Sequence, residues 1–161
     1  MKGQRYNNRL KNKALKDFTF TNLEAENNDL TKRCKFNFSY FDPNQKAGQD
    51  FSELSKKQLT NLINSLIEFN KFSLNHWKVS GPLVMYNNFP IKTKFKHPNY
   101  IPHEVCWGRF RLGNMVRLVG FTVPPAFHGK SHHKTKKQYD KNTFYIVFID
   151  QNHEFWPTKK K

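Results

Sequence analysis

The stretch EVCWGRFRLGNMVRLVGFTVPP, Glu104 to Pro125, decides the fold of this chain. Two runs rich in β-branched and aromatic residues flank a short segment, Leu112-Gly113-Asn114, that favours a turn. This pattern predicts a β-hairpin. The hairpin anchors the interpretation of the segments on either side of it.

The length of the hairpin loop determines which side chains share a face of the sheet. A three-residue loop pairs Arg109 with Arg117, because alternate residues of a strand point to the same side. One face then carries Trp107, Arg109, Arg111 and Arg117. A two-residue Gly113-Asn114 turn would instead place Arg117 opposite Phe110, on the other face. Guanidinium groups match phosphate oxygens and indole rings stack on bases, so the shared face predicts a nucleic-acid platform; the alternative is a solvated outer face.

Downstream, the run FYIVFIDQNHEFW, Phe144 to Trp156, is almost wholly apolar up to Asp150. Apolar residues on both of its faces predict a central strand over Thr143–Ile149. Side chains just past a buried strand are often functional, and His153 is suited to proton transfer near neutral pH, with Asp150 able to orient its ring. The alternative is a polar turn that uses Asp150 and Asn152 for their conformational preferences.

Upstream, alternating apolar residues predict a strand over Lys35–Asp42. A helix capped by Ser52 is expected to run to Leu74, because apolar residues recur at helical spacing. Four prolines keep residues 81–102 irregular, with short extended pieces such as LVMY and IKTKFK. The fold class expected is therefore α+β: an antiparallel β-sheet meander with one long helix packed on one face. Residues 1–33 form a basic N-terminal arm or short helix, and residues 34–161 form the domain.

The charge of the chain indicates a polyanionic partner. Lys and Arg number 28 against 12 Asp and Glu, a net charge of +16. The excess is uneven, since residues 92–141 hold eleven Lys or Arg against only Glu104 and Asp140. Nucleic acid is the first partner to expect, with contacts from Lys94, Lys96, Lys134, Lys136 and Lys137.

Other classes of site and location have little support in the sequence. Cys34 and Cys106 lie far apart, which favours a reduced cytoplasmic protein without a disulfide framework. Acids are scarce after residue 68, so a hydrolytic metal centre is not expected, and no cofactor motif is present. The segment HGKSHHK, with His128, His132 and His133, is expected to be a solvated loop. No run of eighteen apolar residues predicts a membrane span.

The hairpin WGRFRLGNMVRLVGF and the closing FYIVFIDQNHEFW resemble the RelE/ParE superfamily of small toxins, by element order over roughly residues 52–157. The resemblance implies a RelE-like fold and a metal-independent endoribonuclease that cuts mRNA, often on the ribosome, by attack of the 2′-OH on the adjacent phosphate. It also implies an acidic antitoxin as a partner. Arg109, Arg111 and Arg117 would then stabilise the transition state, His153 would act as acid or base, and Trp156 would stack a base. The longer chain, the longer spacing from Arg111 to Arg117 and the basic segment 126–142 depart from that pattern.

Two hypotheses follow. The first is the metal-independent ribonuclease. The second is a non-catalytic protein of a mobile element or phage that binds RNA or a host partner, in which the same arginines contact backbone phosphates and His153 has no catalytic role.

Overall fold

The computed structural model describes residues 23–24, 28–113 and 116–157. Within this part of the chain, no helix is long and apolar enough to cross a membrane. The chain divides after Thr31, and residues from Lys32 onward form one compact unit with an α+β fold. The predicted arm, residues 1–33, falls mostly outside the described residues.

Five strands form one open, mixed sheet in the order β1-β5-β4-β3-β2. The strands are β1 (Lys35–Asn37), β2 (Leu83–Asn87), β3 (Cys106–Leu112), β4 (Val116–Thr122) and β5 (Thr143–Asp150). The predicted antiparallel meander is present as β2 to β5. The strand predicted over Lys35–Asp42 is limited to three residues and pairs in parallel with β5, so the sheet is mixed instead of purely antiparallel.

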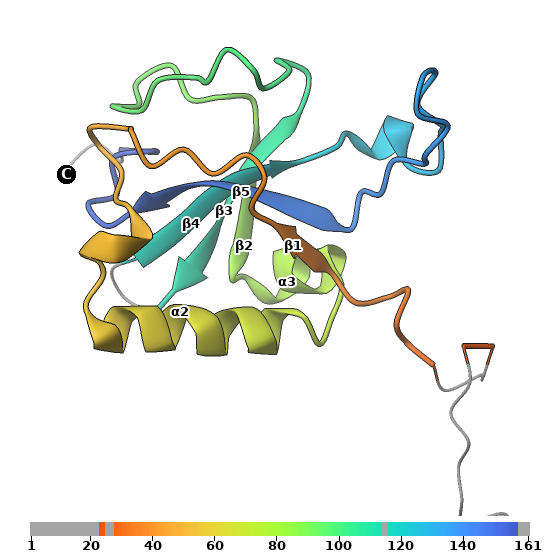
Figure 1. The fold of residues 1–161 in the computed structure, drawn as a ribbon, viewed down its shortest axis with the longest axis horizontal. Coiled ribbons are helices and arrows are strands. Elements are labelled where there is room, and N and C mark those ends of the chain that lie inside the picture. The colour runs from red at the N-terminus through yellow and green to blue at the C-terminus, as the bar shows by residue number, and fades with distance from the viewer. Residues whose placement is uncertain (1–22, 25–27, 114–115, 158–161) are drawn as a thin grey trace, which may run out of the picture. The chain divides into compact units, whose positions relative to one another are not determined.

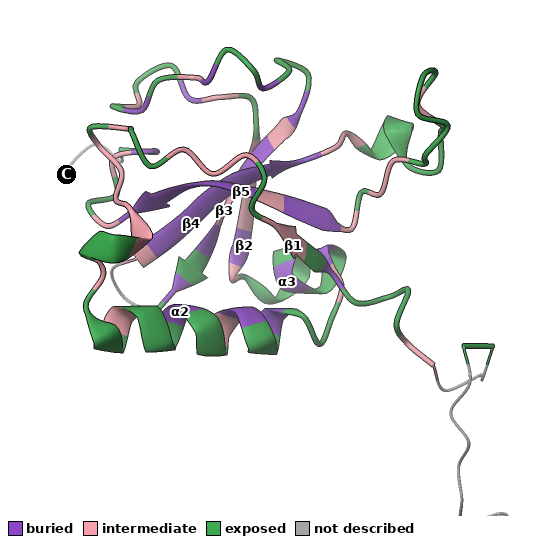
Figure 2. Ribbon diagram, viewed as in Figure 1, coloured by how far each residue is buried: buried purple, intermediate pink, exposed green. Residues whose placement is uncertain are grey.

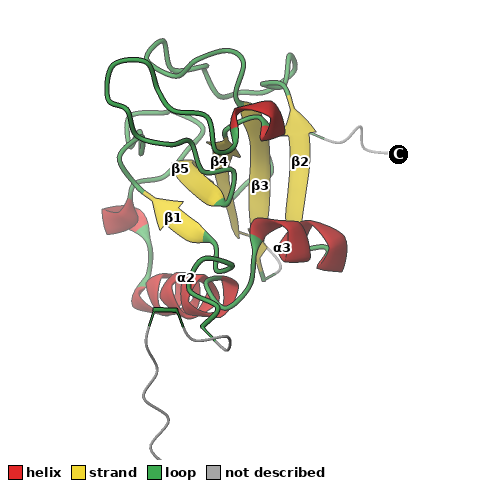
Figure 3. Cartoon of the chain, turned by 90° about the vertical axis from the view of Figure 1, so that its right-hand side faces the viewer, coloured by secondary structure: helices red, strands yellow, loops and turns green. Residues whose placement is uncertain are grey.

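Two helices, and not the single long helix predicted, cover one face of the sheet (Figures 1 and 3). The first is α2 (Lys56–Phe69), whose N-cap is Ser55 with a capping box to Gln58. It ends at Phe69 with Asn70 as its C-cap, and Ser73 caps α3 (Leu74–Ser80) by accepting the N–H of His76. Ser52, the predicted cap, lies instead in a short 3-10 turn, η1 (Phe51–Glu53).

The central strands β3, β4 and β5 are mostly buried (Figure 2), and different kinds of structure cover the two faces of the sheet. On one face, Leu62 and Leu66 of α2 and Trp77 of α3 pack on Phe110 and Leu118. On the other face, side chains from the irregular segments cover the middle of the sheet, and these include Phe95, Ile101 and Val105.

Candidate nucleic-acid interface

The register of the hairpin brings the three arginines together. Arg111 is paired with Arg117 and Leu112 with Val116, so residues 113–115 separate the strands. The loop has three residues, as one of the two alternatives assumed, but it starts one position later, and Arg117 therefore faces Arg111 instead of Arg109. Since directly opposed residues share a face, Arg109, Arg111 and Arg117 all lie on the face away from the helices.

The three arginines differ in how far they are buried. Arg111 is exposed, Arg109 is half-buried, and Arg117 is only 5% exposed. The guanidinium of Arg117 is held by its own hairpin, where Nη1 donates to the carbonyls of Val116 at 3.0 Å and Gly113 at 3.4 Å. An anion approaching this face would therefore meet Arg111 and Arg109 first, with Arg117 behind them.

The positive charge of this cluster is not neutralised by an ion pair. No salt bridge joins Arg109, Arg111 or Arg117 to an acid within the described part of the chain. Burial lowers the pKa of Arg117, and the neighbouring charges of Arg109 and Arg111 lower it further. Asp150 acts in the opposite direction on this pKa, but it ranks behind those causes.

Asp150 is opposite Arg117 in the sheet, yet its carboxylate is used to build the turn that follows β5. One oxygen accepts the backbone N–H groups of Asn152 at 3.2 Å and Glu154 at 3.0 Å, and the other accepts that of Phe155 at 3.0 Å. The side chain is 1% exposed and makes no hydrogen bond to His153 among the described residues. Asp150 therefore shapes the turn after β5. This is the alternative in which the sequence uses Asp150 for a polar turn.

Two aromatic side chains form a wall beside the arginines. Tyr86 of β2 lies beneath Arg109, whose guanidinium carbon is 5.9 Å from the ring centre. Trp156 stacks on Tyr86 with ring centres 4.3 Å apart and planes 5° from parallel. Trp156 is still 43% exposed, so part of its indole is accessible to an approaching base. We name Arg109, Arg111, Arg117, Tyr86 and Trp156 the arginine surface.

Tyr86 was not among the residues selected from the sequence. Burial raises the pKa of its hydroxyl, while the charge of Arg109 acts in the opposite direction, so the hydroxyl stays protonated at neutral pH. The buried hydroxyl oxygen lies close to the Arg109 guanidinium, but it meets the geometry of a hydrogen bond with no described residue. The signal that could have found it is the alternation in LVMY: Val84 and Tyr86 are two positions apart, and Val84 is paired with Arg109. A register shift between Met85 and Asn87 interrupts this regular pairing at Tyr86.

His153 lies at an exposed position of the turn after β5. Its backbone has a φ of 59°, in the left-handed region. It is three residues from Asp150 and three from Trp156, so its Cα lies within about 11 Å of each. Asp150 is opposite Arg117 and Trp156 stacks on Tyr86, so the chain connects His153 to both edges of the arginine surface. Its ring makes no hydrogen bond or aromatic contact to any described residue.

Trp107 does not belong to this surface, which corrects the sequence prediction that it stacks a base. It shares the face of Arg109, but it is 0% exposed. Its indole is enclosed by aromatic rings of Phe89, Phe121, Phe148 and Phe155. The irregular segments cover this end of β3, so Trp107 is a core residue, whereas Arg111 at the other end is exposed.

The predicted lysine contacts lie at several different places. Lys94 is paired with the carboxylate of Glu154, next to the turn that carries His153. Lys96 is exposed, and its backbone N–H donates to Gln45. Lys134, Lys136 and Lys137 are exposed together on the loop between β4 and β5. The structure therefore places only Lys94 beside the turn after β5.

The histidine-rich loop is held together by hydrogen bonds within itself. Residues Ser131 and Gln138 form a bridge, and His132 donates its backbone N–H to Lys137. The Nδ1 atoms of His132 and His128 accept the N–H groups of Thr135 and Lys141. In the described ranges, no group of three or more His, Cys, Asp or Glu side chains is arranged to hold a metal ion.

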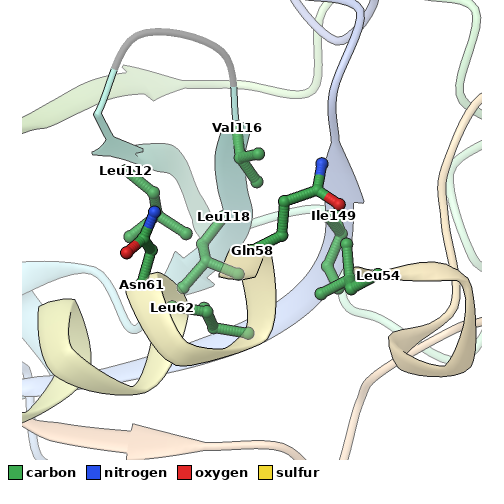
Figure 4. A pocket seen from close by; sticks show the side chains of 8 residues that line it. All are labelled: Leu54, Gln58, Asn61, Leu62, Leu112, Val116, Leu118 and Ile149. Atoms are coloured by element: carbon green, nitrogen blue, oxygen red, sulfur yellow. The ribbon is translucent and has the colours of Figure 1, made fainter. Parts of the chain in front are cut away.

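A small cleft on the helix side of the sheet offers no comparable chemistry (Figure 4). It measures about 50 Å³ and lies between α2 and the ends of β3, β4 and β5. Six aliphatic side chains and the amides of Gln58 and Asn61 line it, without a titratable group. The aliphatic residues are Leu54, Leu62, Leu112, Val116, Leu118 and Ile149.

The arginine surface can therefore hold an anion against clustered guanidiniums and stack a planar group on Trp156. A phosphodiester with an adjacent base has both features. Comparisons of this chain with protein-family models, with curated proteins and with solved structures found no match.

Proposed function

We propose that the arginine surface binds the phosphate backbone of RNA and that the protein is a metal-independent endoribonuclease of toxin type. The observation that carries the proposal is Arg117, a 5% exposed cation that lies beside Arg109 and Arg111 without an ion pair among the described residues. Clustered like charges are unfavourable unless something offsets them, and a bound phosphate does so. The resemblance to RelE/ParE toxins adds the ribosome and an acidic antitoxin as partners in the cytoplasm.

In the proposed reaction, the 2′-hydroxyl oxygen of one nucleotide attacks its own 3′-phosphate. The P–O2′ bond forms and the P–O5′ bond to the next nucleotide breaks, leaving a 2′,3′-cyclic phosphate and a 5′-hydroxyl. Arg109 and Arg111 stabilise the negative charge on the non-bridging oxygens, and Arg117 adds its field from behind them. His153 exchanges protons with the hydroxyl groups, accepting one from the 2′-OH or donating one to the leaving O5′.

The test is cleavage of RNA in EDTA. We expect the wild-type protein to cut, and we expect His153→Ala and Arg111→Ala each to lower the rate at least tenfold with the fold intact. Lys71→Ala is the matched control, because Lys71 is an exposed cation already paired with Glu68 beside the helices. Full activity in both site variants would overturn the assignment of these residues.

One observation favours a second function, RNA binding without cleavage. His153 is exposed, and its ring has no orienting partner among the described residues. A catalytic base in a preorganised site would have such a partner. Under this alternative the wild-type protein leaves RNA intact, while Arg111→Ala still weakens binding.

A further inference from the structure

A second site lies on the same side of the sheet as the arginine surface, at the opposite end of β4. It is a pocket of about 160 Å³, similar to a cavity of about 150 Å³ that binds benzene, so it suits a planar ring system better than a single ion. Phe121 of β4 lines it, four residues from Arg117 and about 13 Å away along the strand. The other lining residues are Tyr40, Pro102, Glu104, Val105, Val123, Pro124, Phe127, Tyr139 and Tyr145.

Five of the ten residues that line this pocket are aromatic. Phe121 and Tyr145 stack with ring centres 4.9 Å apart, and Tyr40 meets both of them edge-on at 5.2 and 5.6 Å. Phe127 and Tyr139 form another edge-on pair at 5.5 Å. Phe127 is 38% exposed, so it lies at the mouth and not in the core. Rings arranged in this way favour a flat ligand.

The polar groups at this pocket have no partners of their own. The hydroxyls of Tyr40, Tyr139 and Tyr145 and the carboxylate of Glu104 make no hydrogen bond or ion pair to any residue that the structure describes. Burial raises the pKa of Tyr145, so its hydroxyl is protonated at neutral pH and can donate. Glu104 is exposed at the rim, and an ionised carboxylate only accepts hydrogen bonds.

The charge around the pocket favours an anionic ligand. The loop from His128 to Lys141 begins next to Phe127, and Lys130 lies 5.5 Å from the centre of the Phe127 ring. Every lysine of this loop is exposed: Lys130, Lys134, Lys136, Lys137 and Lys141. A ligand with a flat apolar face, hydrogen-bond donors and a negative backbone satisfies the walls, the rim and the loop together.

We propose that this pocket holds a guanine base of single-stranded RNA, with Glu104 as the residue that selects it. The proposal rests on the proposed function only in taking RNA as the ligand. Guanine presents N1–H and N2–H₂ side by side, and these two donors match the two oxygens of a carboxylate. Adenine and cytosine place a ring acceptor beside their amino group, and uracil places carbonyls beside its N–H, so each of these bases sets an acceptor against Glu104. The loop lysines bind the flanking phosphates.

The experiment measures binding of labelled 2′-O-methyl octauridylates by fluorescence anisotropy, since these oligonucleotides lack the attacking hydroxyl and stay intact. Four versions carry guanosine, adenosine, cytidine or uridine at one central position. We expect the wild-type protein to bind the guanosine version at least tenfold more tightly than the other three. Glu104→Gln keeps the shape but replaces one acceptor by a donor, so it should remove this preference; Glu68→Gln, an exposed acid beside the helices, should keep it.

The outcomes separate the pocket from the arginine surface. Arg111→Ala should weaken all four oligonucleotides equally and keep the guanosine preference; no effect of Arg111→Ala would count against the proposed function alone. Equal wild-type affinities, a preference for another base, or a guanosine preference that survives in Glu104→Gln would overturn the pocket proposal. Absence of binding by all four oligonucleotides would overturn both.

Discussion

At the scale of the residue, the pairing of Arg111 with Arg117 should favour RNA binding but lower the stability of the fold. Like charges directly across two strands cost about 0.2–1 kcal/mol. We therefore expect Arg111→Gln to raise the free energy of unfolding by about 0.5 kcal/mol in urea titrations while it weakens RNA binding. Lys71→Gln removes a cation that is already paired and should give no gain. A loss of stability in Arg111→Gln would show that the repulsion is offset within the protein.

Asp150 is the residue on which the turn after β5 depends. Asp150→Ala removes the acceptor of three backbone N–H groups, and that of Phe155 is buried. Unsatisfied buried donors cost about 1–3 kcal/mol each, so we expect a loss of about 3 kcal/mol in unfolding free energy, measured by urea titration. Asp150→Asn keeps one acceptor oxygen, so its unfolding free energy should lie between those of wild type and Asp150→Ala. Equal stability of wild type and Asp150→Ala would contradict this role.

At the scale of the element, local patterns predicted the hairpin and β5, whose periodicity and apolar runs are contained in their own sequence. The helix was predicted too long because Phe72 and Leu74 continue its apolar spacing, whereas Ser73 starts a new helix. The Ser55–Gln58 capping box follows the Ser-x-x-Gln pattern of a helix start, so the sequence contains the signal that places the beginning of α2. The parallel pairing of β1 with β5 joins segments over a hundred residues apart, and no local pattern encodes such a partner.

The candidate site was predictable to the same extent. Period-2 geometry put the arginines and Trp107 on one face, but burial differs along that face. The irregular segments bury Trp107, whereas Arg111 stays exposed and Arg117 is held against its own hairpin. Tyr86 and the aromatic pocket depend on how β2 and distant loops meet the hairpin, which periodicity does not specify.

The contact between β4 and β5 depends on the absence of a side chain at Gly120. A Cβ at this position would lie 2.1 Å from the carbonyl oxygen of Tyr145 and 2.7 Å from the ring of Phe144. Because the first of these is backbone of the neighbouring strand, Gly120→Ala should cost about 3 kcal/mol or more, or prevent folding, in thermal and urea unfolding. Gly113→Asn is the control, since Gly113 has open space around its Cβ and Asn tolerates its positive φ. Comparable stability of the two variants would contradict the close approach.

At the scale of the whole molecule, stability should fall as the solution becomes acidic. Burial lowers the pKa of His97, and the neighbouring His103, with ring centres 4.4 Å apart, lowers it further. In the unfolded chain His97 takes up a proton near its ordinary pKa of 6.5, whereas in the folded protein it resists protonation. The contribution of neutral His97 to stability is therefore complete above pH 6.5 and is lost as the pH falls below that value. His97→Gln should reduce the loss of unfolding free energy between about pH 7.5 and 5. Identical pH profiles for wild type and His97→Gln would refute the assignment.

The net charge of +16 acts over the whole surface, whereas the arginine surface acts at one place, and salt separates the two. Each phosphate that a cation neutralises releases counterions, so the logarithm of the RNA affinity falls linearly with the logarithm of the salt concentration. Arg111→Ala should reduce that slope by about 0.7, the value for one contact to a single strand, because Arg111 is the exposed arginine of the cluster. Lys71→Ala changes the net charge by the same amount but removes a paired cation, and it should leave the slope unaltered. If both variants reduce the slope equally in titrations between about 50 and 200 mM salt, RNA is held by the diffuse charge of the protein and not by a built site.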